Sequence, residues 1–334
     1  MEAGMLALLG KTIKLMESLG FLWILTSGFE LNLWDELKEE KTLDDLITLH
    51  PAWDRLLLDH WLEQAGSLGL LIKDNQSYKL SKLGKAVQSY RYEGLEALYK
   101  ELVKHWSPVF ADLPQLITGD ADKKSFASEM EEELIAKASL ASEPFVWPFL
   151  VKKFNDSKWR RILDIGCGEG LYLQKLMEFS PSLQGIGIEI NPEVTLRART
   201  NCAAYNDRLK IICADALDFQ LDIGTFDVSL LNNNIYYFNP DQRITLLYNI
   251  KKVLNPGGQI GILTALRGTN DQLELFSTQM PRHLMSFFLA CHRGFRGLPT
   301  EAEIRELLTL TGYIDLEVIP LPFGMSHFFF ASSV

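Results

Sequence analysis

One short stretch of the chain combines glycines and acids in a pattern that suits a charged, nucleotide-like ligand. Between positions 161 and 170 lie three glycines and two acids, namely Gly166, Gly168, Gly170, Asp164 and Glu169. Glycines let a ligand lie against the backbone, and we expect the turn to need a positive φ angle. A dinucleotide site has the spacing Gly-x-Gly-x-x-Gly and holds a diphosphate. Here the third glycine comes one position earlier, and two carboxylates suit a cationic ligand better than a diphosphate.

A strand and a helix must position these glycines. The short run Ile162 to Ile165 is typical of a buried parallel strand, and a helical pattern opens at Leu171. Strand, glycine turn and helix form the first half of a nucleotide-binding βαβ unit. The stretch resembles motif I of the class I S-adenosylmethionine-dependent methyltransferases, Asp/Glu-x-Gly-x-Gly-x-Gly. This resemblance implies that Asp164 and the three glycines hold the amino-acid end of the cofactor. A Rossmann-like loop for another nucleotide is the alternative.

Two more strand ends carry residues for the same cofactor. Glu189 ends the second strand, 25 positions after Asp164. An acid there can accept hydrogen bonds from both ribose hydroxyls, and a surface or capping glutamate is the alternative. In the family that the chain resembles, an Asp after the third strand bonds the adenine amino group and the next amide contacts the ring. The resemblance assigns these roles to Asp215 and Ala216.

The residues after the fourth strand bear on both binding and catalysis. Three amides, Asn232, Asn233 and Asn234, follow that strand, and ligands of open α/β sheets bind at such ends. We assign Asn232 to cofactor binding; a turn is the alternative. Plant-type O-methyltransferases have a His just beyond this strand that deprotonates the acceptor, and Tyr236 stands in its place. Tyr is a poor base because its pKa is about 10, so another group is the base or the acceptor needs none.

Histidines and arginines gather in the segment 281–296, which we expect to cover the acceptor pocket. With Tyr236, His283 and His292 are the candidate catalytic residues. Each of the two histidines could be a general base, a metal ligand or a structural residue. Because two histidines do not establish a metal site, we predict no metal. Four arginines would suit a carboxylate acceptor, unless they form a solvated face: Arg267, Arg282, Arg293 and Arg296.

The first 90 residues have the element order of a winged helix. We expect an apolar helix over 1–26 that Gly28 ends, a short second helix, a Thr42-capped turn of helix, a third helix from Pro51 to Ala65, and a hairpin over 70–80. A DNA-binding winged helix has a basic third helix, whereas residues 52–66 contain one base and three acids. We therefore expect that this domain does not bind DNA, and a DNA-binding repressor is the weakest alternative.

Three short stretches in this region resemble the N-terminal domain of small-molecule O-methyltransferases of the caffeate and polyketide-tailoring type. They are LWDEL at 33–37, TLDDL at 42–46 and GSLGLL at 66–71. That family uses its winged helix to dimerise and to close over the partner's active site. The resemblance therefore implies a homodimer formed through the N-terminal domain.

Composition and length limit the remaining choices. The 334 residues carry a formal net charge of −10, which argues against nucleic acid as the main substrate. No apolar run approaches the roughly 18 residues that span a bilayer, and we see no secretory signal. Four scattered cysteines fit a reducing compartment. We therefore expect a cytoplasmic protein without a membrane segment.

We predict an α/β protein with three parts. These are a winged-helix dimerisation domain over 1–90, a helical linker and pocket lid over 91–155 (with helices at 92–103, 126–141 and 144–154), and a Rossmann-like, seven-stranded S-adenosylmethionine-binding domain over 156–334. Late features include the family's Leu-x-Pro-Gly-Gly turn at 254–258 and a capping box from Thr300 to Glu303.

The predicted function is methyl transfer from S-adenosylmethionine to a small molecule in specialised metabolism, with oxygen as the first acceptor atom. The alternatives are C-methylation of a 2-oxo acid, with or without a metal, and a cofactor-binding regulator without catalysis. The acceptor itself is not predicted, because acceptor pockets are built from variable side chains on several segments.

Overall fold

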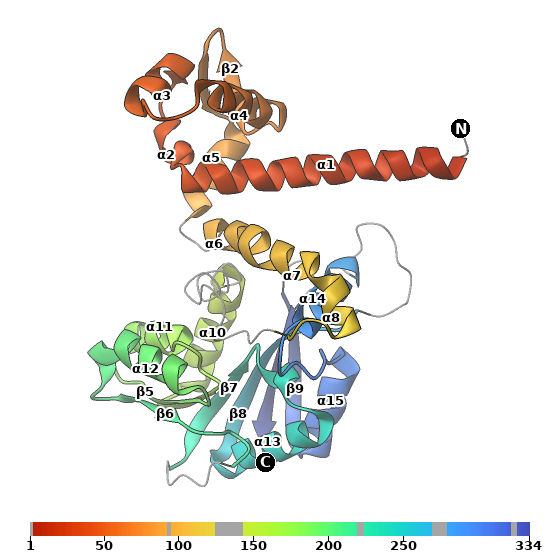
Figure 1. Cartoon of the computed structure of the whole chain (residues 1–334). Coiled ribbons are helices and arrows are strands. Elements are labelled where there is room, and N and C mark those ends of the chain that lie inside the picture. The colour runs from red at the N-terminus through yellow and green to blue at the C-terminus, as the bar shows by residue number, and fades with distance from the viewer. Residues whose placement is uncertain (1–2, 92–94, 124–142, 219–223, 269–278, 322–325) are drawn as a thin grey trace. The chain divides into compact units, whose positions relative to one another are not determined.

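The computed structural model describes residues 3–91, 95–123, 143–218, 224–268, 279–321 and 326–334. The chain forms two compact units (Figure 1), residues 1–111 with 131–144 and residues 112–130 with 145–334. The helix predicted over 126–141 lies outside the described residues. Within the described part, no helix is both long and apolar enough to cross a bilayer.

The N-terminal unit is a winged helix preceded by a long helix. Its elements are α1 (Ala3–Glu30), α2 (Leu33–Glu36), β1 (Lys41–Thr42), α3 (Leu43–Leu49), α4 (Arg55–Ser67), β2 (Leu71–Asp74), β3 (Ser77–Leu80), α5 (Lys82–Tyr90), α6 (Leu95–Glu101), the π-helix η2 (Leu102–Trp106) and α7 (Ser107–Ala111). The antiparallel hairpin β2–β3 gains β1 as a third strand, in the order β1-β3-β2. The predicted winged helix is confirmed.

Two predicted helix ends in this unit are wrong. Gly28 does not end α1 but lies inside it. A Cβ at this position would come 2.5 Å from ring atoms of Trp34. The glycine is thus required by close packing against Trp34. Helix α4 begins at Arg55, after Pro51, because the side chain of Asp54 caps it by accepting a hydrogen bond from the backbone N–H of Leu57.

The second unit contains a seven-stranded mixed sheet. Its strands are β4 (Arg161–Ile165), β5 (Gln184–Glu189), β6 (Leu209–Cys213), β7 (Phe226–Asn232), β8 (Leu254–Ala265), β9 (Tyr313–Pro320) and β10 (Ser326–Ser333). They lie in the order β6-β5-β4-β7-β8-β10-β9. All pairs are parallel except those that β10 makes with β8 and β9. The predicted seven-stranded sheet is therefore confirmed.

Helices cover both faces of this sheet. The helices of this unit are α8 (Leu113–Thr118), α10 (Glu143–Ser157), α11 (Leu171–Phe179), α12 (Pro192–Asn201), η4 (Ala203–Tyr205), η5 (Ile235–Tyr237), α13 (Pro240–Lys252), α14 (Gln279–Ala290) and α15 (Glu301–Leu310). One apolar core joins the sheet to α10, α11 and α12, and the other joins it to α13 and α15. The predicted capping box at Thr300 and Glu303 begins α15.

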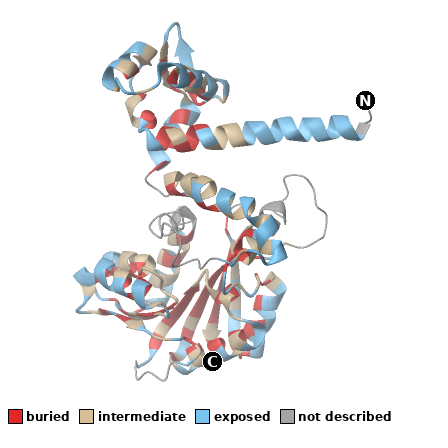
Figure 2. Ribbon diagram, viewed as in Figure 1, coloured by how far each residue is buried: buried red, intermediate tan, exposed pale blue. Residues whose placement is uncertain are grey.

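The central strands are buried on both faces (Figure 2), which explains their nearly continuous apolar sequences. In β4, Ile162 and Leu163 belong to opposite cores. Because β4, β5, β6 and β7 are parallel and adjacent, their carboxyl ends meet at one edge of the sheet. The residues predicted to bind the cofactor all lie at this edge.

Candidate functional site

The glycine loop connects β4 to α11 through three glycines in left-handed conformations. Their φ angles are 64° at Gly166, 55° at Gly168 and 80° at Gly170. Side chains rarely adopt such angles, so the predicted need for positive φ is confirmed. Gly166 is restricted further, because a Cβ there would lie 2.2 Å from Nδ2 of Asn234.

Asp164 lies in β4, directly before the loop, and only 2% of it is exposed. Its Oδ1 has no hydrogen-bond partner. Burial, and then the neighbouring charge of Glu189, raise the pKa of Asp164 to about 8. A buried carboxyl group without partners is unfavourable, and a bound cation would stabilise its charged form.

The second acid expected to make the loop anionic is paired within the protein. Oε1 of Glu169 lies 3.0 Å from Nε of Arg197 in α12. This ion pair offsets the charge of Glu169. The acids that face each other at the loop are instead Asp164 and Glu189, and this pairing follows from the adjacency of β4 and β5.

Glu189 ends β5 and holds two loops together. Its Oε2 accepts a hydrogen bond from the Gly168 N–H at 3.2 Å, and its Oε1 accepts one from the Asn191 N–H at 2.9 Å. Each carboxylate oxygen retains a further lone pair for a ligand. At the exit of β6, Asp215 is exposed and accepts a hydrogen bond from the Leu217 N–H, while Ala216 is buried.

Two of the three amides after β7 have polar atoms that lack partners. Both Oδ1 and Nδ2 of Asn232, and Oδ1 of Asn234, are buried without a hydrogen bond. The Nδ2 of Asn234 donates a hydrogen bond to the backbone carbonyl of Ile165. Asn234 was not among the predicted site residues, although the unusual run of three amides was its signal.

Asp164 and Asn232 project from the same face of the sheet. Asp164 pairs in register with Leu230 of β7, and Asn232 lies two residues farther along. Side chains alternate along a strand, so Leu230 and Asn232 share a face with Asp164. The strand ends thus combine three unpartnered oxygens, from Asp164, Asn232 and Asn234, with one unpartnered amide nitrogen. An α-amino acid matches this set, because its ammonium donates three hydrogen bonds and its carboxylate accepts one.

Tyr236, which was predicted to stand in the place of the plant-type His, belongs to a packed aromatic group. It is 8% exposed, and its ring centroid lies 4.9 Å from that of Tyr237 and 6.1 Å from that of Phe295. Burial raises its pKa well above the usual 10. Its backbone carbonyl accepts a hydrogen bond from the Arg296 N–H. These contacts strengthen the expectation that Tyr236 is a poor base.

The two candidate histidines have different surroundings. The ring of His283 lies against Gly268, just beyond β8, where a Cβ would come 2.7 Å from its Cδ2 and Nε2. His292 is 2% exposed, and its Nδ1 lies 2.9 Å from the carbonyl of Phe288. If Nδ1 carries the proton in this bond, Nε2 is the basic nitrogen. Within the described residues, no three His, Cys, Asp or Glu side chains form a metal-binding group.

Three of the four arginines expected over the pocket, Arg267, Arg293 and Arg296, are exposed. Nη2 of Arg267 lies 2.9 Å from Oε1 of Glu303. Arg282 is half-buried, and burial lowers its pKa. A buried arginine that was not predicted fixes the backbone here: Arg243 donates to the carbonyls of Ile235 and Gly297, at 3.1 and 2.6 Å. This arginine joins η5 to the segment before α15.

The fold and the site together define a class of protein. A sheet of the order β6-β5-β4-β7-β8-β10-β9, with a three-glycine turn after β4 and an acid ending β5, is the class I methyltransferase fold. Residues 162–258 match the family described as a methyltransferase domain. The chain therefore carries a methyltransferase domain, in agreement with the predicted class of protein and its predicted cofactor, S-adenosylmethionine.

Comparisons with individual proteins agree with this assignment. The chain is 29% identical to sterol 4-C-methyltransferase strm-1 of Caenorhabditis elegans, over 46% of this chain and 45% of that protein. It is 24% identical to O-methyltransferase 12 of Dictyostelium discoideum, over 60% of this chain and 55% of that protein. The chain thus spans about half the length of the curated relatives it matches. The solved structure of the pyocyanin biosynthetic protein PhzM has the same fold, with a TM-score of 0.76 and 16% identity over 98% of this chain and 100% of that one.

Proposed function

We propose that this protein transfers the methyl group of S-adenosylmethionine to a small molecule. The observation that carries the proposal is the set of unpartnered buried atoms on Asp164, Asn232 and Asn234, which matches the amino-acid end of that cofactor. The glycine loop supplies backbone that a ligand can approach closely. When bound, the cofactor supplies a methyl group already activated by its sulfonium.

In this proposal each strand end binds one part of the cofactor. Glu189 accepts hydrogen bonds from the ribose hydroxyls through lone pairs that its bonds to Gly168 and Asn191 leave open. Asp215 and the Ala216 amide bind the adenine. Because β6, β5 and β4 are adjacent in that order, the adenine, the ribose and the amino acid of the cofactor would follow one another along the edge. Alignment of the acceptor with the methyl group provides the rest of the catalysis.

Oxygen is the proposed acceptor atom, and carbon is the second candidate. The relatedness to O-methyltransferase 12 supports oxygen. Carbon is supported by the relatedness to a sterol C-methyltransferase, and also by the burial of Tyr236, which leaves no effective base at the position of the family's His. An acceptor whose carbon or oxygen is acidified by a neighbouring carbonyl would need no strong base there.

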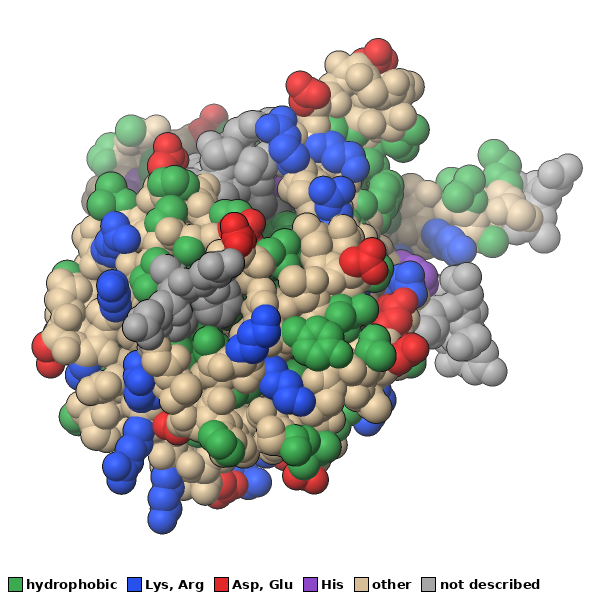
Figure 3. Space-filling model, turned by 90° about the horizontal axis from the view of Figure 1, so that it is seen from below, with side chains coloured by type: hydrophobic (Ala, Val, Ile, Leu, Met, Phe, Trp, Pro, Cys, Tyr) green, Lys and Arg blue, Asp and Glu red, His purple; other side chains and the backbone are tan. Residues whose placement is uncertain are grey.

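The charge distribution supports a small molecule, and not a nucleic acid, as the acceptor. The formal net charge is −10, whereas phosphate binding needs a basic surface. On the face seen in Figure 3, basic and acidic side chains are mixed and do not form one basic field. We further propose that the protein acts in the cytoplasm, because its four cysteines are all free thiols.

A labelled-methyl transfer assay tests this function. Purified protein and methyl-labelled S-adenosylmethionine are mixed with phenols and catechols in one pool and 2-oxo acids in another, each with and without a chelator. Label in the phenol pool that resists the chelator supports O-methylation. Label in the 2-oxo acid pool that disappears with the chelator indicates metal-assisted C-methylation. Cofactor binding without transfer to any acceptor would contradict the proposed activity and favour a regulator.

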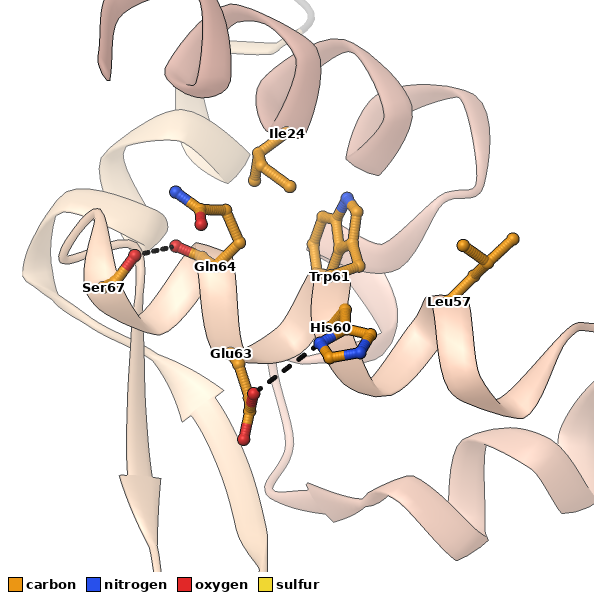
Figure 4. Close-up of a pocket in the computed structure, with 7 residues that line it drawn as sticks. All are labelled: Ile24, Leu57, His60, Trp61, Glu63, Gln64 and Ser67. Atoms are coloured by element: carbon orange, nitrogen blue, oxygen red, sulfur yellow. Dashed lines mark hydrogen bonds and ion pairs between the residues drawn. The ribbon is translucent and has the colours of Figure 1, made fainter. Parts of the chain in front are cut away.

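We propose that two copies associate through the N-terminal unit. Along the first half of α1, apolar side chains recur three or four residues apart and are 46–66% exposed, as at Met5, Leu9, Ile13 and Met16. Such a stripe normally packs against a partner. A hollow of about 550 Å³ on the same unit is lined by Ile24 of α1 and by side chains of α4 that include Trp61 and Gln64 (Figure 4).

Sedimentation equilibrium tests the association. The wild-type chain should be a dimer, and the double substitution Leu9→Lys with Met16→Lys should make it a monomer, because buried charges are costly. Ser18→Lys, which adds one positive charge on the opposite side of α1, is the control and should leave the dimer intact. A wild-type chain that stays monomeric at micromolar concentration would contradict the proposal.

A further inference from the structure

The side chain of Asn234 presents one particular atom to the proposed cofactor site. Its Nδ2 donates a hydrogen bond to the backbone carbonyl of Ile165 and occupies the space where a Cβ on Gly166 would lie. Because a carbonyl only accepts hydrogen bonds, the amide nitrogen must face Ile165. The Oδ1 of Asn234 is therefore the atom left for a ligand, and it is buried without a partner.

The backbone on the two sides of Asn234 is held by different contacts. Before it, Asn233 has a φ of 52°, and its N–H donates a hydrogen bond to the carbonyl of Leu263 in β8 at 2.7 Å. After it comes η5, a 3₁₀ helix of three residues. The hydrogen bonds of such short helices have poor geometry. The placement of Asn234 therefore depends on what supports η5 from outside.

Arg243, near the start of α13, supplies this support. Only 9% of it is exposed. Its Nε donates a hydrogen bond to the carbonyl of Ile235 at 3.1 Å, and its Nη2 donates one to the carbonyl of Gly297 at 2.6 Å. Ile235 is the first residue of η5 and directly follows Asn234. Because the guanidinium is planar and rigid, the two bonds fix this end of η5 relative to the segment before α15.

The segment that Arg243 reaches packs against the same turn. The ring centroid of Phe295 lies 6.1 Å from that of Tyr236, and the N–H of Arg296 donates a hydrogen bond to the carbonyl of Tyr236 at 2.9 Å. Gly297, the second anchor of the guanidinium, therefore belongs to a segment that is itself bound to η5.

We propose that Arg243 is a positioning residue, which keeps the Oδ1 of Asn234 directed at the ammonium of the cofactor's amino-acid end. The inference rests on the proposed function. Arg243 bonds the turn and acts on the ligand through Asn234. Without its bond to Ile235, η5 loses its outer anchor, and Asn234 is held firmly from the β7 side alone. Ligands with an amino-acid end then lose affinity, whereas ligands that lack this end do not.

Calorimetric titration of the full chain with two ligands tests the inference. S-adenosylhomocysteine has adenine, ribose and amino-acid parts, whereas methylthioadenosine lacks the amino acid. Arg243→Met keeps a long side chain and removes its donors. This variant should bind S-adenosylhomocysteine about tenfold more weakly, as expected when a hydrogen bond to a charged group is lost, and its affinity for methylthioadenosine should change less than about twofold.

Arg208→Met is the matched control for the loss of an arginine that holds the backbone. Arg208 is half-buried and lies just before β6, at the opposite end of the strands. It donates to three backbone carbonyls, those of Met177, Ser180 and Leu183. Both variants should lower the free energy of unfolding in urea, because both leave carbonyls without partners. Arg208→Met should nevertheless change neither affinity.

A double-mutant cycle with Asn234→Ala determines whether Arg243 acts through Asn234. Asn234→Ala alone should weaken binding of S-adenosylhomocysteine at least about tenfold. Adding Arg243→Met to it should weaken binding no further, because the atom that Arg243 positions is already gone.

Two results would overturn the inference. Additive losses in the cycle would mean that Arg243 acts by another route. Equal weakening of both ligands in Arg243→Met would mean that the arginine only holds the fold together. If Arg243→Met does not fold, Arg243→Lys keeps the positive charge without the fork that reaches two carbonyls, and it gives the same comparison. Failure of the wild-type chain to bind either ligand would instead contradict the proposed function.

Discussion

The two halves of the ligand-binding edge differ in how their polar groups are satisfied. At the ends of β4 and β7, Asp164, Asn232 and Asn234 have buried atoms without partners. Beyond them, toward the acceptor side, Tyr236 is packed among rings and Nδ1 of His292 lies beside a backbone carbonyl. Unsatisfied buried groups are costly, so the first half is built for a ligand that supplies the missing bonds. Around Tyr236, the hydrogen bonds of the Arg243 side chain and of the Arg296 N–H hold the backbone in place.

The largest effect that would test this difference is expected at Gly166. Gly166→Ala places a Cβ against Asn234 and forces alanine to a φ of 64°. Because Asn234 must then move off the loop, binding of S-adenosylmethionine should weaken at least about 100-fold. Gly257→Ala is the control, since Gly257 has a φ of 74° but nothing within 4 Å of a new Cβ. Calorimetry measures both variants, and equal affinities would show that contact with Asn234 is unimportant.

The same contrast explains what the sequence could predict. Glycines at 166, 168 and 170 and the acid at the end of β5 lie at short, regular distances from recognisable strands, so their places at the edge followed from the sequence pattern. Other contacts join residues that are far apart in the sequence: Glu169 pairs with Arg197, and Asn234 contacts the glycine loop. No local pattern encodes such contacts, because they depend on how α12 and η5 pack against the sheet.

The acceptor side was harder to predict for the same reason. Whether Tyr236 faces a ligand or a core depends on Phe295 and on the segment that Arg243 holds through Gly297, more than 50 positions away. Helix ends failed similarly: Gly28 is a typical helix-ending residue by its own conformational preference, but contact with Trp34 decides its role. Tertiary packing overrode local preference in both cases.

Loss of Glu189, the acid proposed to bind the ribose, should have the second largest effect. Glu189→Ala removes a carboxylate that also joins Gly168 to Asn191. Affinity for S-adenosylmethionine should fall more than about tenfold, as expected when hydrogen bonds to a charged group are lost. Glu193→Ala, four residues later in the first turn of α12, is the control. An unchanged affinity in Glu189→Ala would remove the ribose assignment.

Asp164 should make the stability of the free protein depend on pH. Its pKa rises from 3.8 to about 8 on folding, chiefly through burial. Between these values the folded chain holds a proton that the unfolded chain releases, so the free energy of unfolding falls as pH rises, by up to about 1.4 kcal/mol per unit. This loss is complete above the folded pKa. Below the unfolded value both states are protonated and the full stability remains.

Asp164→Asn removes this titration, since an amide stays neutral. Compared with wild type, the variant should therefore gain stability at about pH 8.5 relative to about pH 5, as measured by urea unfolding. In Asp207→Asn, a substitution on an exposed loop, the free energy of unfolding should change between the two pH values by the same amount as in wild type. If the free energy of unfolding depends on pH in the same way in wild type and in Asp164→Asn, the buried acid is ionised in the free protein and is satisfied by a group other than the cofactor.

The smallest effect is expected at Tyr236, although this residue was predicted to stand in the place of the catalytic His. Tyr236→Phe keeps the ring contacts with Tyr237 and Phe295 and removes only a hydroxyl whose pKa lies well above 10. Turnover with an acceptor found in the labelled-methyl assay should stay within about twofold of wild type, because a group that remains protonated takes up no proton. A 100-fold drop would instead mean that the phenol orients or deprotonates the acceptor. Tyr236 would then belong with Asp164 and Asn234 among the groups that a ligand completes, and the boundary between the two halves of the edge would move past η5.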